Sequence, residues 1–181
     1  MPSIYLAGPE VFLADALDMG RRKKELCDAY GLEGLFPLDA EFVPGEEASS
    51  RSIFEANVAM IRRCDGVIAN LTPFRGASAD AGTVFEVGMA FALEKPVFAY
   101  TNVSAIYAAR CVDTADAPGE RLFAADGLSV EDFGLFDNLM IAEALRAQGH
   151  DVAAQEAAPQ GRYTDLAAFE LCLRKAAAFF A

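Results

Sequence analysis

The sequence has few of the residues that build metal sites and disulfide frameworks. Its four cysteines are far apart, no CxxC pair occurs, and His150 is the only histidine. A structural zinc site needs several thiols or imidazoles at short spacing, so we expect no metal site. Scattered cysteines without a framework indicate reduced thiols and a cytoplasmic protein.

Targeting and membrane-spanning patterns are lacking as well. The N-terminus enters a strand-like pattern without a basic region, and Glu10 and Asp15 interrupt the segment that follows. We therefore expect no signal peptide. No apolar run reaches the roughly 18 residues that a membrane helix requires, so we expect no membrane span.

Positive charge is scarce, since 15 basic residues stand against 27 acidic ones and the net charge is −12. Nucleic acids and anionic membranes are bound by clustered Lys and Arg, so neither is expected as a partner. The one basic cluster, RRKK at residues 21–24, is interpreted as the solvated end of a helix. With 181 residues, 54% of them hydrophobic, the chain is predicted to form a single domain over residues 1–181.

Short apolar runs alternate with amphipathic patterns along the chain. Strands are predicted at residues 3–7, 35–38, 66–70 and 96–100, and helices at about 10–30, 52–63, 81–95, 136–148 and 165–180. This alternation implies a mostly parallel sheet with helices on both faces, so we expect an α/β, flavodoxin-like three-layer fold. The sheet is predicted to have five strands in the order 2-1-3-4-5. The fifth strand is not located, because residues 101–135 are predicted to be irregular and 149–162 a linker.

Glu86 is a carboxylate inside an otherwise apolar helix, flanked by Phe85 and Val87. The loop before this helix ends at Asp80, which is placed to accept hydrogen bonds from the first turn as an N-cap. Burial of a carboxylate is costly unless the group is paired or used, so Glu86 is a candidate functional residue. The alternative is a solvated helix glutamate behind a plain cap.

The first predicted strand ends at Gly8, where the lack of a side chain lets the backbone approach a ligand closely. A tight turn without a ligand is the alternative. Ligands of α/β folds gather at the carboxyl ends of the strands, so Tyr5, Asp80 and Glu86 are expected to share one crevice. Two carboxylates and a phenol suit displacement at an anomeric carbon, where a carboxylate stabilises developing positive charge and then bonds covalently.

Three motifs resemble those of a known family. The runs DGVIA at 65–69, LTPFRG at 71–76 and DxGTxxExGxA at 80–90 are similar to segments of the nucleoside 2-deoxyribosyltransferase family. With the first strand and a further segment, FDNLMI, the resemblance extends over residues 3–100 and 136–141. It implies the same flavodoxin-like fold.

The resemblance also implies a reaction. Glu86 would attack C1′ of a 2′-deoxynucleoside, the base would leave, and a second base would attack the deoxyribosyl ester. Asp80 would face the base and handle its proton, and Tyr5 would hydrogen-bond Glu86 and orient it. The partners implied are deoxynucleosides and free bases, as in purine salvage, and no metal or organic cofactor is implied.

The resemblance assigns further residues to substrate binding, namely Gly8, Phe12, Glu41, Asn57, Gly82, Asn138 and Met140. Some members carry an aspartate near the place of Asn57; an amide cannot act as a general acid, so Asp80 is left as the main proton handler. In the family, the Asn-x-Met segment at 138–140 reaches into a neighbouring subunit's site, which implies a homo-oligomer of dimer pairs or a hexamer. The alternatives are a solvated loop glutamate at 41 and a cap or satisfied core amide at 57.

Two other functions fit the same residues. A 2′-deoxynucleoside 5′-monophosphate N-glycosidase would use the same glutamate with water as the acceptor. It would need a phosphate pocket, for which Arg75 and Ser78 are candidates in the central loop. A non-catalytic nucleotide-binding module is the other alternative, since the fold hosts many functions.

Overall fold

The computed structural model describes residues 1–39, 49–112 and 122–181. Within these residues the sheet contains five strands, all paired in parallel, in the order β2-β1-β3-β4-β5. They are β1 Ser3–Ala7, β2 Glu33–Leu35, β3 Gly66–Asn70, β4 Val97–Thr101 and β5 Ala153–Ala154. The predicted α/β, flavodoxin-like order 2-1-3-4-5 is confirmed.

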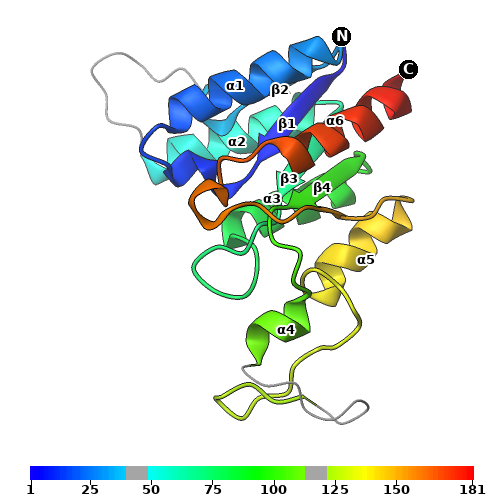
Figure 1. Ribbon diagram of the computed structural model, residues 1–181. Helices are drawn as coiled ribbons and strands as arrows, with labels where there is room; N and C mark the ends of the chain where they lie inside the picture. The colour runs from blue at the N-terminus through cyan, green and yellow to red at the C-terminus, as the bar shows by residue number, and fades with distance from the viewer. Residues whose placement is uncertain (40–48, 113–121) are drawn as a thin grey trace.

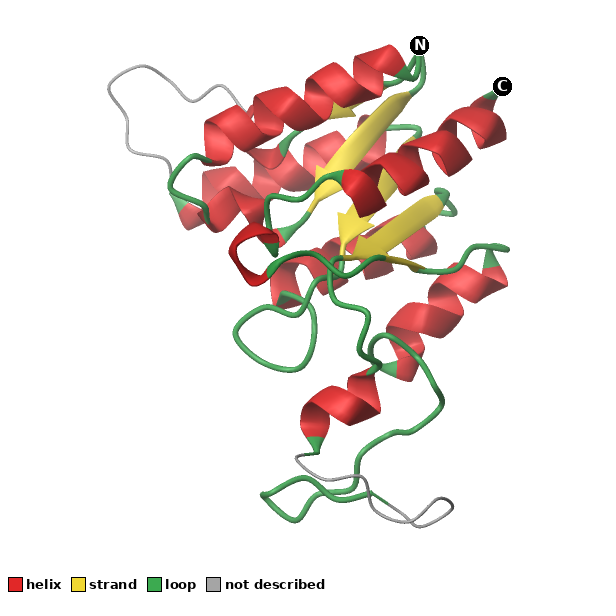
Figure 2. Cartoon of the chain, in the orientation of Figure 1, coloured by secondary structure: helices red, strands yellow, loops and turns green. Residues whose placement is uncertain are grey.

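Helices cover both faces of the sheet (Figures 1 and 2). They are α1 Ala16–Ala29, α2 Ser50–Arg63, α3 Ala81–Ala92, α4 Tyr107–Cys111, α5 Leu139–Ala147 and α6 Ala167–Phe180, with the short 3-10 turns η1 Pro9–Phe12, η2 Pro37–Asp39 and η3 Pro159–Gly161. Alternation along β1 explains the two cores. Tyr5 and Ala7 pack with α2, α3 and α5, whereas Ile4 and Leu6 pack with α1 and α6.

The first helix begins later than predicted. Pro9 starts the 3-10 turn η1, and Leu13 then takes an extended conformation that interrupts the helical path, so α1 begins at Ala16 instead of Glu10. Phe12 consequently lies outside the helix and is exposed. The end of the helix agrees with the predicted limit at about residue 30, because α1 ends at Ala29 and Gly31 follows the C-cap Tyr30 with a φ of +73°.

Other boundaries shift for local reasons. Strand β2 occupies Glu33–Leu35 instead of 35–38, because Pro37 lacks an N–H and begins η2. Helix α5 begins at Leu139 instead of residue 136, with Asn138 as its N-cap. Helix α6 begins at Ala167, two residues later than the predicted start at 165.

The segment predicted as a linker at 149–162 contains β5, the missing fifth strand. This two-residue strand of alanines is too short to stand out as an apolar run. The described residues 102–112 and 122–135 hold α4 and an isolated bridge between Phe123 and Ser129, and they extend beyond the sheet (Figure 1). In the described parts of the chain, no helix is long and apolar enough to cross a bilayer.

Lys23 contradicts the interpretation of the basic cluster as a solvated helix end. It lies in the middle of α1 with a side chain that is 0% exposed, and its Nζ is 2.7 Å from Glu10 Oε1. Tyr100 Oη donates to the same oxygen over 2.8 Å, and the ammonium lies 4.8 Å from the centroid of the Phe169 ring. The ion pair therefore joins η1, α1, β4 and α6 inside one core.

Breaking this ion pair should strongly destabilise the fold. Lys23→Met leaves the buried Glu10 carboxylate unpaired, and we expect it to lower the free energy of unfolding by about 3–5 kcal/mol. Arg21→Gln is the matched control, because its ion pairs with Asp18 and Glu25 are exposed and should contribute little to stability. Urea unfolding followed by circular dichroism measures both, and equal effects would contradict the assignment. Combining Lys23→Met with Glu10→Gln should recover part of the loss.

Candidate active site

Tyr5 and Glu86 meet between the sheet and α3. Tyr5 lies in the middle of β1 with its side chain on the α3 face, and its Oη donates to Glu86 Oε1 over 2.6 Å. The phenol is buried, while the carboxylate is only partly covered. The structure thus brings together two of the three residues predicted to share a crevice, and it leaves Glu86 Oε2 outside this hydrogen bond.

The environment of Glu86 changes its acidity. Burial raises the pKa of the Glu86 carboxyl from 4.5 to about 7, the hydrogen bond from Tyr5 lowers this pKa, and the negative charge of Asp80 raises it. Burial also raises the pKa of the Tyr5 phenol well above its ordinary value, with a further contribution from Glu86. The Tyr5 phenol therefore stays protonated and donates a hydrogen bond to Glu86, whose carboxyl titrates near neutral pH.

Asp80 is the N-cap of α3, as predicted. Its Oδ2 accepts from Thr83 N over 2.9 Å and from Thr83 Oγ1 over 3.1 Å. The cap leaves Oδ1 outside these two bonds. It also places a second carboxylate close enough to Glu86 to influence its pKa.

A cavity of about 380 Å³ opens at Glu86 between α2 and α3. It is lined by Phe54, Asn57, Val58, Ile61, Gly82, Phe85 and Glu86. Asn57 Oδ1 is buried and has no hydrogen-bond partner among the described residues, so it is available to a ligand. Phe54 and Phe85, whose ring centroids are 6.2 Å apart, were missed from the sequence because exposed aromatics on two separate helices form no local motif.

Gly8 and Phe12 do not line this cavity. Gly8 is buried at the end of β1, and a Cβ there would come within 2.0 Å of Glu10 Oε2 and 2.9 Å of Asn70 Cβ. The glycine is thus required by packing. Phe12 stacks on Phe74 with ring centroids 5.2 Å apart, at the carboxyl ends of β1 and β3.

Asn138 and Met140 lie at the start of α5. Asn138 Oδ1 accepts from Met140 N over 3.0 Å, and Asn138 Nδ2 donates to Glu131 Oε1 over 2.9 Å. The Met140 side chain is 72% exposed and lines a second cavity of about 500 Å³ between α3 and α5, together with Phe91. Glu41 lies outside the described residues.

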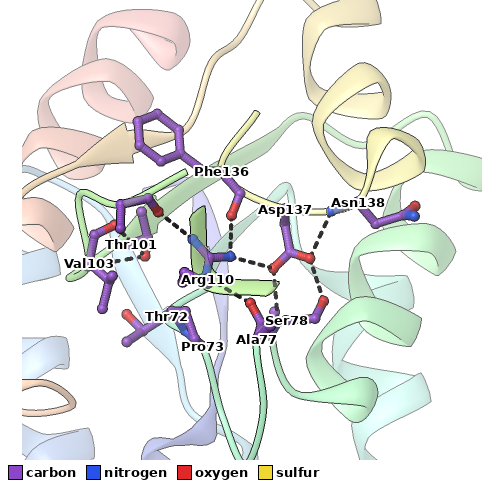
Figure 3. Close-up of polar contacts among 12 residues, drawn as sticks. Thr72, Pro73, Ala77, Ser78, Thr101, Val103, Arg110, Phe136, Asp137 and Asn138 are labelled. Atoms are coloured by element: carbon purple, nitrogen blue, oxygen red, sulfur yellow. Dashed lines mark hydrogen bonds and ion pairs between the residues drawn. The ribbon is translucent and has the colours of Figure 1, made fainter. Parts of the chain in front are cut away.

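Asp137 is a buried residue that directly precedes the N-cap of α5, near the start of the helix predicted over 136–148. Its carboxylate turns back to the loop before α3, where it accepts hydrogen bonds from Ser78 and Ala79, a contact that no local pattern indicates (Figure 3). Arg110 of α4 joins this network through backbone carbonyl groups. Among the described residues, no group of three or more His, Cys, Asp or Glu side chains could hold a metal ion.

Comparisons with known proteins identify the family and the fold. The family model described as nucleoside 2-deoxyribosyltransferase matches residues 4–140. A solved structure of a 2-desoxiribosyltransferase from Leishmania mexicana is 31% identical with a TM-score of 0.67, covering 92% of this chain and 97% of that one. A 2-deoxyribosyltransferase from Bacillus psychrosaccharolyticus has the same fold, at 20% identity and a TM-score of 0.54, with coverage of 91% and 93%.

A curated relative, an uncharacterized protein of Schizosaccharomyces pombe, is 34% identical over an alignment of 172 residues, and the match covers 84% of this chain and 81% of the relative. The family match includes Tyr5, Asp80 and Glu86 and extends to Met140. The chain belongs to the nucleoside 2-deoxyribosyltransferase family.

Proposed function

We propose that the protein exchanges the base of 2′-deoxynucleosides by double displacement through a deoxyribosyl ester on Glu86. The observation that carries this proposal is the 2.6 Å hydrogen bond from Tyr5 Oη to Glu86 Oε1 at the edge of the cavity between α2 and α3. One carboxylate oxygen is thereby fixed and the other is free to attack. The similarity to the Leishmania mexicana 2-desoxiribosyltransferase supports the choice of reaction.

In the first step, Glu86 Oε2 bonds to C1′ as the bond from C1′ to the base nitrogen breaks. The electron pair of that bond leaves with the base, and Asp80 relays a proton from solvent to that base. In the second step, a nitrogen of the incoming base attacks C1′, the ester bond breaks, and Glu86 recovers its charge while Asp80 receives the proton. No metal or organic cofactor is needed, because each step exchanges one bond to C1′ for another.

Each residue of the site has a separate role in this proposal. Tyr5 holds Glu86 in one orientation, and Asn57 offers its unpartnered Oδ1 to an N–H or O–H group of the substrate. Gly82 leaves space on α3 one turn before Glu86, within the same cavity. Gly8, Phe12 and Glu41 stay as proposed binding residues from the family resemblance.

The direct test is an exchange assay. Incubation with deoxyinosine or thymidine and free adenine should produce deoxyadenosine, which chromatography detects. Free deoxyribose phosphate from a deoxynucleoside monophosphate would instead identify a hydrolase, and binding without turnover would identify a binding module. With donor alone, intact-mass spectrometry should show a deoxyribosyl adduct on the protein.

Glu86→Gln is the matched control for that assay and should lose both the exchange and the adduct. An adduct on the variant would place the nucleophile elsewhere. The raised pKa means that the protonated Glu86 carboxyl contributes stability below pH 4.5, and this contribution is lost as the pH rises through about 7. At pH 8, Glu86→Gln should therefore melt at least as high as the wild type, which separates lost chemistry from lost folding.

Removing the Tyr5 hydroxyl should move the pH dependence. Its hydrogen bond lowers the pKa of Glu86, so Tyr5→Phe should raise that pKa further above neutral. Because the ionised carboxylate attacks, the acid limb of kcat/KM should move upward by about one to two pH units. Initial rates between pH 5 and 9 measure the limb, and an unchanged limb with lower rates would contradict the role of Tyr5 in ionisation.

We also propose that the protein is a homo-oligomer in which Asn138 reaches a neighbour's site. The exposed Met140 and Phe91 border an apolar cavity beside α3, which is a surface that a second copy would cover. Asn138 lies at the edge of that surface as the N-cap of α5. Its amide would exchange the contact with Glu131 for one with the substrate sugar.

Subunit mixing tests this arrangement. Asn138→Ser keeps a capping hydroxyl, and it should lose activity because the neighbour's site lacks the amide. When Asn138→Ser and Glu86→Gln are co-expressed, mixed oligomers contain sites with both groups intact, so activity should reappear above that of either variant alone. Light scattering gives the subunit count; a monomer, or mixtures no more active than the separate variants, would overturn the proposal.

A further inference from the structure

The loop at residues 71–80 joins β3 to α3 and ends at Asp80. It therefore carries the carboxylate whose charge acts on Glu86, and it sets the starting point of the helix that contains Glu86. Within the loop, Phe74 N donates to Ser78 O over 2.9 Å, so residues 74–78 form a closed turn. The last three residues before Asp80 are bound by groups from a distant part of the chain.

Asp137 is the centre of that attachment (Figure 3). Its side chain is buried, and its Oδ2 accepts from Ala79 N over 2.8 Å, one residue before Asp80. Its Oδ1 accepts from Ser78 Oγ and, over 2.8 Å, from Asn138 N. One carboxylate thus binds the end of the loop and the start of α5 at the same time.

Arg110 holds the same two segments from the other side. Its Nε donates to Ala77 O over 2.8 Å, and its Nη2 donates to Phe136 O over 2.6 Å. The Nη2 atom also lies 3.9 Å from Asp137 Oδ2, with both side chains largely buried. Hydrogen bonds that involve charged groups are stronger than neutral ones, so Asp137 and Arg110 together hold the loop firmly to the segment before α5.

We propose that Asp137, supported by Arg110, is a positioning residue that sets the place of Asp80 relative to Glu86. The proposal rests on the proposed function, since it assigns Asp137 a part in the same reaction without contact to the substrate. Displacement of a reacting group by about 1 Å can lower a rate about 100-fold, so an anchor one residue away from Asp80 controls the chemistry.

A purely structural role predicts a different result from a positioning role. Among the described residues, the ionisable groups that act on the pKa of Glu86 are Tyr5 from β1 and Asp80 from the start of α3. The cavity wall from α2 consists of Phe54, Asn57, Val58 and Ile61, none of which ionises. Release of the loop should therefore change the position of one charge relative to Glu86, that of Asp80. The other two contributions to the pKa of Glu86, its burial and the hydrogen bond from Tyr5, should stay unchanged.

The experiment compares Asp137→Ala and Asp137→Asn with the wild type. We expect Asp137→Ala to lower kcat about 10–100-fold with little change in KM. The acid limb of the pH profile should move to lower pH, because Asp80 no longer opposes the ionisation of Glu86. Asp137→Asn keeps an acceptor for Ala79 N and should recover part of the rate. Asp132→Asn, an exposed carboxylate of the same segment, is the control and should match the wild type.

A second readout does not depend on activity. Carbon-13 NMR titration of the Glu86 carboxyl should give a lower midpoint in Asp137→Ala than in the wild type. A lower midpoint in a protein without exchange activity would support the positioning and overturn the proposed function. An unchanged midpoint, or a fall in rate that only follows a loss of folded protein in thermal melts, would overturn the positioning role of Asp137.

Discussion

One hydrogen bond joins the middle of the sheet to the helix that covers it, from Tyr5 of β1 to Glu86 of α3. Two effects oppose each other at this carboxylate. Burial makes ionisation costly, and the phenol lowers that cost by donating to the charged form. A carboxyl partner would compete for a proton, whereas the raised pKa of Tyr5 keeps the phenol as a donor. Because this balance depends on the hydrogen bond, the position of α3 relative to β1 must be fixed.

Sheet topology supplies this fixed relation. Tyr5 and Glu86 are 81 positions apart, yet β1 pairs directly with β3, and β3 leads through the 71–80 loop into α3. A parallel crossover returns the helix across the strands just formed, so α3 packs on the face where Tyr5 points. The N-terminus of α3, capped by Asp80, then lies at the carboxyl edge of the sheet, where ligands of such folds bind.

Sequence reasoning succeeded where the determining contacts are local. The strand at 66–70 and the cap at Asp80 were predicted from runs and spacing alone, because a buried parallel strand and an N-cap each leave a short pattern. It failed where the partner is remote. Lys23 looks like part of a charged helix end until Glu10 and the ring of Phe169 are brought to it by folding. Asp137 resembles a helix-start residue, although its carboxylate serves a loop 58 positions earlier.

Helix α3 shows how one short element serves several surfaces. Val87 and Ala90 are buried against the sheet, while Gly82 borders the cavity at Glu86. Gly88 lines the second cavity, between α3 and α5, and a Cβ added there would point into open space. Each glycine in a helix costs roughly 0.5–1 kcal/mol relative to alanine, and the ionised carboxylate adds its own desolvation cost. The buried face of α3 and the Asp80 cap must offset both of these costs. Because the cap lies at the end of the 71–80 loop, the attachment of that loop also affects the chemistry at Glu86.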